Sequence, residues 1–392
     1  MLASTRLKYI AAPVAALAFH GPVMAVNGAQ PGGYGTKNAA MGGASIALPL
    51  DAEAAANNPA GLGVLPSSWS LGTQVFDGHS SADYVLPGND LHNHQTEPAP
   101  EGGFNWRVNS AWALGLSVAG SGAGSNYGQA ALPVPGADSA KTTLRVVEMV
   151  PAVAWTPSPT LSLGLGLNVA VEQFEAKGVI VPAPVPGGLA QLPEHGSQRS
   201  TGVGLRAGAL WKASDDLNIG LSLKSRTRMG RLDGYEQDLL AYSSGRLDVP
   251  AQYGLGIAWQ ANQHLTLAAD WLRILWGDIK AMKDPNGFAW RNQSVLRVGA
   301  GWQVDERWTL RAGASHNGGQ IDSARTVQNL LVPSVNRNGY TLGVGWRLAH
   351  GDELSLGYEL DPRTTLTGSG PSVGTSLTSK VQMFLLGYDH RF

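Results

Sequence analysis

Apolar residues alternate with glycine or polar residues along many short segments of this chain, and this period of two constrains its fold more than any other feature. The segment 161–171, LSLGLGLNVAV, has leucine or valine at every odd position, and 340–348, YTLGVGWRL, repeats the pattern. Such alternation predicts β-strands with one apolar face. It fits a membrane barrel with its apolar face outward or a soluble sandwich with that face inward, so the connections and the aromatic residues have to decide.

The connections between the predicted strands alternate strictly between short and long. Turns of two or three residues alternate with long loops that are polar or rich in proline and glycine, as at 77–101, 121–142, 175–198 and 318–337. An even number of strands with connections sorted in this way is typical of bacterial outer-membrane barrels, and a soluble sandwich has no reason to show it. The fourteen predicted strands cover 69–76, 102–108, 111–120, 143–156, 160–174, 199–212, 216–228, 249–260, 264–275, 293–304, 307–317, 338–348, 352–360 and 380–391.

Tryptophans mark one end of the predicted barrel. Each even-numbered strand carries one, in most cases near the end that enters a short turn; they are Trp106, Trp155, Trp211, Trp259, Trp302 and Trp346. Because tryptophan prefers the membrane interface, this placement predicts an aromatic girdle on the periplasmic side. The chain ends on a strand with Phe384, Leu386, Tyr388 and Phe392 on one face. This ending resembles the signal read by the outer-membrane assembly machinery, so we expect that machinery, through Phe392, and outer-membrane lipid as partners.

The N-terminal 25 residues are predicted to be a signal peptide. Arg6 and Lys8 precede an apolar run from Ile10 to Phe19, and a small-residue cleavage site ends at Ala25. No later stretch reaches the roughly 18 apolar residues of a transmembrane helix. The predicted location is therefore the bacterial outer membrane, as an integral protein after the signal peptide is removed.

The composition excludes several classes of protein. Charged residues make up only 15% of the chain, against roughly 25% in soluble proteins. The formal net charge of −1 offers no basic surface for nucleic acid. Cysteine is absent, which excludes a disulfide framework and thiolate metal sites.

Residues 26–65 differ from the rest of the chain and are predicted to form a plug. The segment is rich in alanine and glycine, breaks at Gly42-Gly43, and ends in Asn57-Asn58-Pro59-Ala60. Within it, 51–56 predicts a short helix with Asp51 as N-cap, ended before the proline. A disordered periplasmic tail would be more charged and less rich in alanine. Since fourteen strands enclose more space than side chains can fill, the predicted fold is all-β: a 14-stranded antiparallel transmembrane β-barrel, residues 66–392, plugged by a small N-terminal hatch, residues 26–65.

Alternation directs several charged side chains into the predicted lumen. The candidate ligand contacts are Arg206, Arg226, Arg297, Arg311 and Arg347; the other inward charges are Lys224, Glu148, Glu172, Asp270 and Glu359. These groups either line a wet lumen and pair across strands, or one or two of the basic groups receive the carboxylate of an amphipathic ligand. The third strand is dense in glycine, with Gly115, Gly120 and Gly122. Its glycines indicate either a kink that opens the wall sideways or a flexible exit into the loop.

Signals for catalysis, metals and cofactors are weak. His92 and His94 lie in a predicted loop without further ligands, where histidines are usually solvated. Ser315, His316 and Asn317 are adjacent on a strand, so their side chains point to opposite faces and cannot form a triad. We therefore predict no catalytic residue, no metal site, no cofactor and no enzymatic activity.

The segment 27–62, NGAQPGGYGTKNAAMGGASIALPLDAEAAANNPAGL, resembles the N-terminal hatch of the FadL-type outer-membrane transporters (the OMPP1/FadL/TodX family). The segments 253–271, 296–317 and 335–348 are similar to that family in style. The resemblance implies a fourteen-stranded barrel with a hatch, and the family's Asn-Pro-Ala motif falls on Asn58, Pro59 and Ala60. It further implies that a ligand enters from outside, binds an apolar pocket, displaces the hatch and leaves near a kinked third strand.

Two departures limit what the resemblance transfers. The mature N-terminus, VNGAQPGG, lacks an aromatic residue that could reach a ligand pocket, and the long loops differ from the family. The expected function is passive, ligand-gated outer-membrane transport of hydrophobic molecules, with long-chain fatty acids as the default. The alternatives are a channel for aromatic or aliphatic hydrocarbons, a general porin for small polar solutes, and a barrel enzyme acting on lipids. A further role as phage receptor or adhesin is compatible with each of them.

Overall fold

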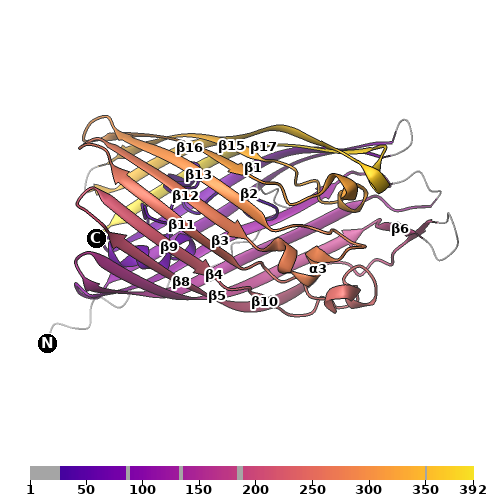
Figure 1. Cartoon of the computed structure of the whole chain (residues 1–392), viewed down its shortest axis with the longest axis horizontal. Coiled ribbons are helices and arrows are strands. Elements are labelled where there is room, and N and C mark those ends of the chain that lie inside the picture. The colour runs from indigo at the N-terminus through magenta and orange to yellow at the C-terminus, as the bar shows by residue number, and fades with distance from the viewer. Residues whose placement is uncertain (1–26, 85–88, 132–135, 183–188, 349–350) are drawn as a thin grey trace.

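The computed structural model describes residues 27–84, 89–131, 136–182, 189–348 and 351–392. The predicted signal peptide, residues 1–25, lies outside these ranges. Long antiparallel strands run side by side around a barrel, with the C-terminus at the end where the short turns lie (Figure 1). No helix in the described ranges is both long and apolar enough to cross a membrane.

A single antiparallel sheet forms the wall. Its strands are β1 (Ser68–Tyr84), β2 (Asp90–Arg107), β3 (Trp112–Asn126), β4 (Lys141–Ser158), β5 (Leu161–Lys177), β8 (Gln198–Lys212), β9 (Leu217–Lys224), β11 (Gln252–Gln260), β12 (Leu265–Ile274), β13 (Gln293–Gln303), β14 (Trp308–Asn317), β15 (Asn338–Arg347), β16 (Glu353–Thr367) and β17 (Thr375–Arg391). Each strand pairs with its neighbours in sequence, and β1 pairs with β17, so the sheet closes on itself. The two-residue β10 (Arg228–Met229) pairs with β8 beyond the end of β9 and continues its path. The predicted 14-stranded barrel is therefore confirmed.

Several strands are longer than the sequence predicted. The predicted loop 77–101 is mostly strand, because β1 and β2 pair from Ser68 and Asn105 up to Asp83 and Asp90. Likewise β3, β16 and β17 extend several residues into predicted loops. A further predicted loop, 175–198, contains the small hairpin β6 (Ile180–Pro182) and β7 (Leu189–Gln191). These extensions were missed because polar residues, glycine and proline in a strand look the same as loop residues in sequence.

The two faces of the wall differ as the alternation predicted. The six tryptophans of the predicted girdle are all exposed and face outward near the short turns, where Trp346 stacks on Trp308 with ring centroids 5.7 Å apart. Trp112 and Trp155 form a second stacked pair, with centroids 6.0 Å apart. Above them the outer face continues with exposed aliphatic side chains, among them Leu71, Leu165, Leu205, Leu255, Leu296, Leu342 and Leu386. The outer wall is thus an apolar band with aromatic residues at one margin, as a lipid bilayer requires.

Residues 27–65, the hatch segment, lie inside the barrel toward the short-turn end, where the indigo ribbon is seen in Figure 1. They form α1 (Thr36–Ala39), α2 (Ala54–Asn57) and the 3₁₀ helix η1 (Pro59–Gly63), and almost all of them are buried. At the other end, the loops fold over the lumen. These loops carry η2 (Tyr235–Gln237), η3 (Ala241–Ser243), η4 (Trp276–Asp278), α3 (Lys280–Lys283), η5 (Ser323–Arg325), η6 (Val327–Asn329) and η8 (Gly370–Ser372).

Candidate functional site

Asn58 docks the hatch segment onto the barrel wall. Its Nδ2 donates to the carbonyl of Ile46 (2.7 Å) and to the carbonyl of Ala209 on β8 (3.3 Å), while its Oδ1 accepts from the backbone N–H of Ala60 (3.1 Å). The residue is 2% exposed, so these bonds have no competition from water. Pro59 holds Asn58 in an extended conformation (φ −152°, ψ 107°), which ends α2 at Asn57 and starts η1. Ser162 on β5 donates to the carbonyl of Ala60 (2.7 Å) and adds a second wall contact.

Further contacts fix the segment to other strands of the wall. The Asp270 carboxylate on β12 accepts from the N–H groups of Ser45 (2.7 Å) and Ile46 (3.0 Å). The N–H of Gly42 donates to Thr341 Oγ1 on β15 at 2.9 Å. The wall therefore holds the hatch segment by hydrogen bonds to its backbone on several sides, in addition to apolar packing such as that of Leu62 with Ala113 and Val150.

Substitution of Gly42 by alanine should weaken these contacts between the hatch segment and the wall. Its φ is +67°, and an added Cβ would lie 2.7 Å from Val298 O and 2.7 Å from Ala314 N of the wall. We expect Gly42→Ala to loosen the hatch segment and speed hydrogen exchange of its amides at least tenfold. Gly128→Ala is the matched control, because Gly128 has a similar φ of +65° with nothing near its Cβ. Equal exchange in the two variants would show that the wall does not hold this turn.

Three of the five candidate arginines lie in the lumen and are already engaged. Arg206 pairs with Glu148 (Nη2–Oε2 2.7 Å) and also donates to the carbonyl of Ala56 in the hatch segment. Arg311 pairs with Glu353 (2.7 Å), and Arg297 donates to the carbonyl of Gly43 (3.2 Å). In this state these arginines neutralise buried carboxylates or hold the hatch segment, so a ligand carboxylate would have to compete for them.

The other two arginines lie elsewhere. The wall is irregular at Ser225 and Arg226, where the alternation shifts by one residue, so Lys224 stays buried in the lumen and Arg226 lies beside Asp248 in an outer pocket. Arg347 ends β15 at the short-turn rim, where it is exposed. The predicted lumen position is therefore wrong for Arg226, because one extra residue reverses the faces of a strand. Arg347 lies on the face of β15 that the alternation predicts. Its position at the rim of the barrel, rather than deeper in the lumen, was not predicted.

Buried acidic side chains lie within the hatch segment and on the wall beside it. Lys37 bridges Glu353 (3.2 Å) and Asp389 (3.0 Å) on the wall. Burial, reinforced by the nearby Asp389 carboxylate, raises the pKa of Asp51 to about 8. Asp51 is not the N-cap of a helix as predicted; α2 begins at Ala54, and the Asp51 side chain instead accepts from the N–H of Glu53 (3.1 Å).

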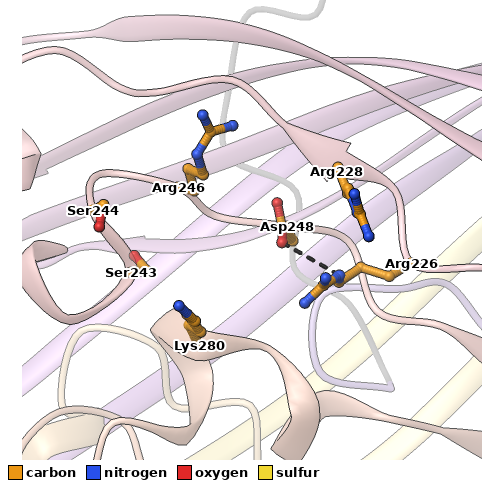
Figure 2. A pocket seen from close by; sticks show the side chains of 7 residues that line it. All are labelled: Arg226, Arg228, Ser243, Ser244, Arg246, Asp248 and Lys280. Atoms are coloured by element: carbon orange, nitrogen blue, oxygen red, sulfur yellow. Dashed lines mark ion pairs between the residues drawn. The ribbon is translucent and has the colours of Figure 1, made fainter.

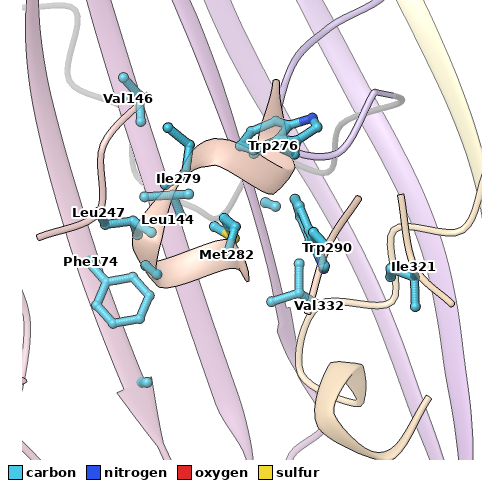
Figure 3. Packing of buried hydrophobic residues seen from close by; sticks show 14 of the residues in the cluster. Leu144, Val146, Phe174, Leu247, Trp276, Ile279, Met282, Trp290, Ile321 and Val332 are labelled. Carbon is cyan, nitrogen blue, oxygen red and sulfur yellow. The ribbon is translucent and has the colours of Figure 1, made fainter. Parts of the chain in front are cut away.

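Above the hatch segment lies a cluster of buried apolar residues that we call the apolar chamber. Wall residues Leu144 and Phe174 meet loop residues Met282, Trp290 and Val332, as Figure 3 shows. The unfilled space among them is only about 20 Å³, and Thr142 is the single polar side chain that lines it. Binding pockets usually measure roughly 300–1,000 Å³. A ligand can therefore enter only if loop or N-terminal residues move aside.

The first described residues of the chain occupy the floor of this chamber. Ala29 lines it, and the backbone at Gly28 lies against the ring of Trp276. Ser334 donates to the carbonyl of Gly28 (2.8 Å). The first described residues thus reach the chamber with small side chains and their backbone. As the sequence indicated, they include no aromatic residue.

The wall is not paired between the upper halves of β2 and β3. The two strands pair only from Gly102 opposite Val118 to Arg107 opposite Ala113. Beyond that point β2 remains paired with β1 and β3 with β4. From Ala119 to Ser125 both faces of β3 are buried, whereas a wall strand normally alternates. We call this unpaired stretch the β2–β3 gap.

Two prolines explain why β2 has a free edge here. The N–H of Arg107 donates toward β1, to Ser67 Oγ (3.0 Å), so odd-numbered residues of β2 face β1 and even-numbered residues face β3. Pro98 and Pro100 are even-numbered and stand at the first positions beyond the paired stretch. Proline has no N–H, so neither residue can donate to β3. The gap is therefore encoded in the sequence of β2 as well as in the glycines of β3.

The predicted glycines of β3 lie on both sides of the point where pairing ends. Gly115 is in the paired part and lets Leu62 of the hatch segment approach closely. Gly120 and Gly122 lie along the gap, and a Cβ on Gly122 would overlap the carbonyl of Leu144 on β4. Ala123, in the same stretch, lines the apolar chamber, so the chamber borders the gap.

One group of histidines has more partners than the sequence suggested. His94 stacks on His79 across β1 and β2, with ring centroids 4.0 Å apart, and its Nε2 lies 2.7 Å from Asp77 Oδ1. These three residues offer ligand atoms within 4.8 Å of one another on the outer face and could hold a divalent cation, although Lys380 stands directly opposite His79 on β17. His316 is exposed and Ser315 buried, which confirms that they point to opposite faces.

The family model described as outer membrane protein transport protein (OMPP1/FadL/TodX) matches residues 14–361. The chain belongs to this family. Members of the OMPP1/FadL/TodX family are transport proteins of the bacterial outer membrane, so the short-turn end of the barrel is periplasmic and the long-loop end extracellular.

Solved structures agree with the fold. The P. putida toluene transporter TodX is 16% identical, with 92% of this chain and 99% of that chain covered and a TM-score of 0.73. A Pseudomonas aeruginosa FadL homologue is 20% identical, with coverage of 93% and 100% and a TM-score of 0.68. The Ralstonia pickettii toluene transporter TbuX is 18% identical, with coverage of 92% and 99% and a TM-score of 0.66. A search of curated protein sequences found no match.

Proposed function

We propose that this protein mediates the passive, ligand-gated passage of small neutral hydrophobic molecules, such as toluene, across the outer membrane. The observation that carries the proposal is the apolar chamber, whose lining includes Leu144, Phe174, Met282 and Trp290 and no charged side chain. Transfer of an apolar molecule from water into such a site is favourable by about 25 cal/mol per Å² of apolar surface buried. A neutral hydrocarbon leaves no polar group unpaired there.

The β2–β3 gap supports a sideways exit from the chamber. Ala123 belongs both to the chamber lining and to the stretch of β3 that lacks a partner strand. A hydrophobic molecule that left through this gap would pass into membrane lipid without crossing the polar lumen below. The proposed lateral-opening strand is therefore β3, with Gly120 and Gly122 along the gap.

The hatch segment serves in this proposal as the gate. Hydrogen bonds that Asn58 and the backbone N–H groups of Gly42 and Ile46 donate to the wall hold it in the lumen, and its first residues reach the chamber at Ala29. A ligand that displaces Ala29 from the chamber pulls on the same segment. Displacement of the gate requires a ligand to prefer the open state by only a few kcal/mol, which is within reach of ordinary binding energies.

A long-chain fatty acid is the second candidate, and a separate cavity favours it. This cavity, of about 40 Å³, lies at the hatch segment and is lined by Arg206, Lys224 and Arg297. Arg297 Nε is buried without a hydrogen-bond partner among the described residues. A fatty acid that filled the chamber with its chain could place its carboxylate against this nitrogen. A general porin is less well supported, because the hatch segment and the chamber residues fill the lumen.

Binding to the purified protein distinguishes these candidates. Val332→Asp places a carboxylate in the chamber, and Val373→Asp makes the same change at an exposed loop position. We expect calorimetric titration with toluene to show saturable binding that weakens at least tenfold in Val332→Asp and is unchanged in Val373→Asp. Tight oleate binding together with no toluene binding would favour the fatty acid. If the affinity for toluene is the same in Val332→Asp as in the wild type, the chamber is not the binding site.

The end of the chain supports one further part of the proposal. Phe392 is exposed at the periplasmic rim, and its N–H donates to the carbonyl of Ser67 at 3.2 Å. An exposed aromatic residue at the end of the closing strand β17 is accessible to the assembly machinery that we propose as its partner.

A further inference from the structure

A basic pocket of about 530 Å³ opens on the outer surface of the extracellular half of the barrel. Figure 2 shows the side chains that line it, which come from three segments: the end of the β9–β10 path, the loop 230–251 and α3. The lining residues are Arg226, Arg228, Ser243, Ser244, Arg246, Asp248 and Lys280. Four cationic side chains face one carboxylate, so the pocket is strongly positive.

The pocket faces away from the lumen. Arg228 lies opposite Val203 of β8, whose side chain is 58% exposed on the outer wall. The next residue, Met229, is 1% exposed and belongs to the apolar core inside the barrel. Arg246 is exposed while its neighbour Leu247 is buried in the same core. Met229 and Leu247 therefore lie between the pocket and the apolar chamber, and Asp248 lines both the pocket and an inner cavity beside the chamber.

The charges in the pocket are only partly compensated. Asp248 accepts from the N–H of Met229 (2.8 Å) and lies 3.6 Å from Arg226 Nε. Arg246 donates to the carbonyl of Met229 (2.6 Å). Arg228 and Lys280 are exposed and form no ion pair within the described part of the chain. Two free cations beside the exposed Ser244 hydroxyl are suited to an anion with several acceptor oxygens.

The height of the pocket points to membrane lipid. Between the girdle residue Trp211 and Val203 the outer face of β8 carries only alanine and leucine. At about 3.3 Å per residue and a tilt near 40°, this run corresponds to roughly 20 Å of depth, close to the apolar band of an outer-membrane barrel at about 25 Å. The cations thus begin where the apolar band ends, at the level of the lipid headgroups. Tyr253, exposed on the outer face at the same margin, is a typical interfacial residue.

We propose that this pocket binds the phosphorylated headgroup of an outer-leaflet lipid. The lipid's acyl chains would lie on the apolar outer face of β8, β9 and β11 below the pocket, where Val203, Leu223 and Tyr253 are exposed. Its phosphate would contact Arg228 and Lys280, with the exposed Ser244 hydroxyl as a further donor. Basic pockets at the membrane surface recognise lipid phosphates in the same manner. The site is distinct from the chamber and does not depend on which hydrophobic molecule the protein carries.

Lipid binding to the full-length protein in neutral detergent tests this proposal, with native mass spectrometry as the readout. The probes are bis-phosphorylated lipid A, the same lipid after removal of its phosphates, and inorganic phosphate. We expect the wild-type protein to bind the phosphorylated lipid at least tenfold more tightly than either other probe. This comparison needs no variant, so it holds even if a substitution impairs folding.

The double variant Arg228→Gln/Lys280→Gln should lose at least tenfold in affinity for the phosphorylated lipid. Lys212→Gln/Arg307→Gln is the matched control, since it removes two cations from periplasmic turns and changes the net charge equally. Equal losses in the two variants would overturn the proposal, as would equal binding of the two lipids. Inorganic phosphate that binds as tightly as the lipid would show an anion site unrelated to the membrane.

Discussion

Replacement of Pro98 and Pro100 by threonine should close the β2–β3 gap and reduce uptake of a hydrophobic substrate by about fivefold or more. The double variant restores two N–H donors on the side of β2 that faces β3. Each new strand hydrogen bond contributes about 0.5–1.5 kcal/mol. Together they favour the closed wall by about 1–3 kcal/mol, roughly a 5- to 150-fold shift in population. The initial rate of uptake of radiolabelled toluene by cells that lack their own transporter measures the effect.

Pro151→Thr is the control for this experiment. Pro151 lies on β4, which is paired with β3 and β5 along most of its length. We expect its uptake rate to equal that of the wild type at equal amounts of folded protein. If Pro98→Thr/Pro100→Thr also transports at the wild-type rate, the gap is not the route by which the substrate leaves.

The second large effect is expected from Asn58→Ala, which should release the hatch segment. The substitution removes three hydrogen bonds, including the one to Ala209 of the wall, and leaves the buried carbonyl of Ile46 without this donor. At about 1 kcal/mol per bond, the docked hatch segment is destabilised by roughly 3 kcal/mol, of which about 1 kcal/mol comes from the bond to the wall and the rest from bonds within the segment. Hydrogen exchange of amides in residues 38–65 should accelerate about a hundredfold, whereas the amides of β11 to β15 should exchange as in the wild type.

Asn57→Ala separates this latch from general damage to the hatch segment. The Asn57 side chain bonds to the backbone of Tyr34, within the hatch segment (Nδ2–O 2.9 Å), and makes no described hydrogen bond to the wall. We expect its effect on exchange to be at least fivefold smaller than that of Asn58→Ala. Acceleration that is equal in both variants, or that spreads into the barrel strands, would contradict the role of Asn58 as a latch to the wall.

The fold was predictable because independent features of the sequence indicated the same barrel. The alternation of apolar residues set the two faces of the wall, and the short turns set its strand order. The girdle tryptophans, such as Trp346, were found at the expected margin. Strand ends were less predictable, because β1 and β2 extend beyond the membrane band, where nothing requires an apolar outer face.

The candidate site was only partly predictable. Asn58 and Gly42 stand out in sequence because a proline and a paired glycine force unusual backbone there. The chamber residues Met282 and Trp290 come from loops without periodicity, so no pattern could show that they meet over the lumen. The position of Arg226 was predicted wrongly because the alternation of inward and outward side chains shifts by one residue at Ser225 and Arg226. Pro98 was read as a loop residue, although a proline within an alternating stretch is also the sign of a strand with a free edge.

Uptake of radiolabelled toluene and oleate by cells lacking their own transporter, with and without this protein, tests the central claim most directly. The account predicts that the protein accelerates toluene uptake severalfold or more, and that Val332→Asp in the chamber abolishes this acceleration while Val373→Asp preserves it. If the protein accelerates the entry of oleate alone, the substrate is a fatty acid and Arg297 has a direct role in binding its carboxylate. If the protein accelerates the entry of neither compound, the claim that this barrel carries hydrophobic molecules through its apolar chamber is contradicted.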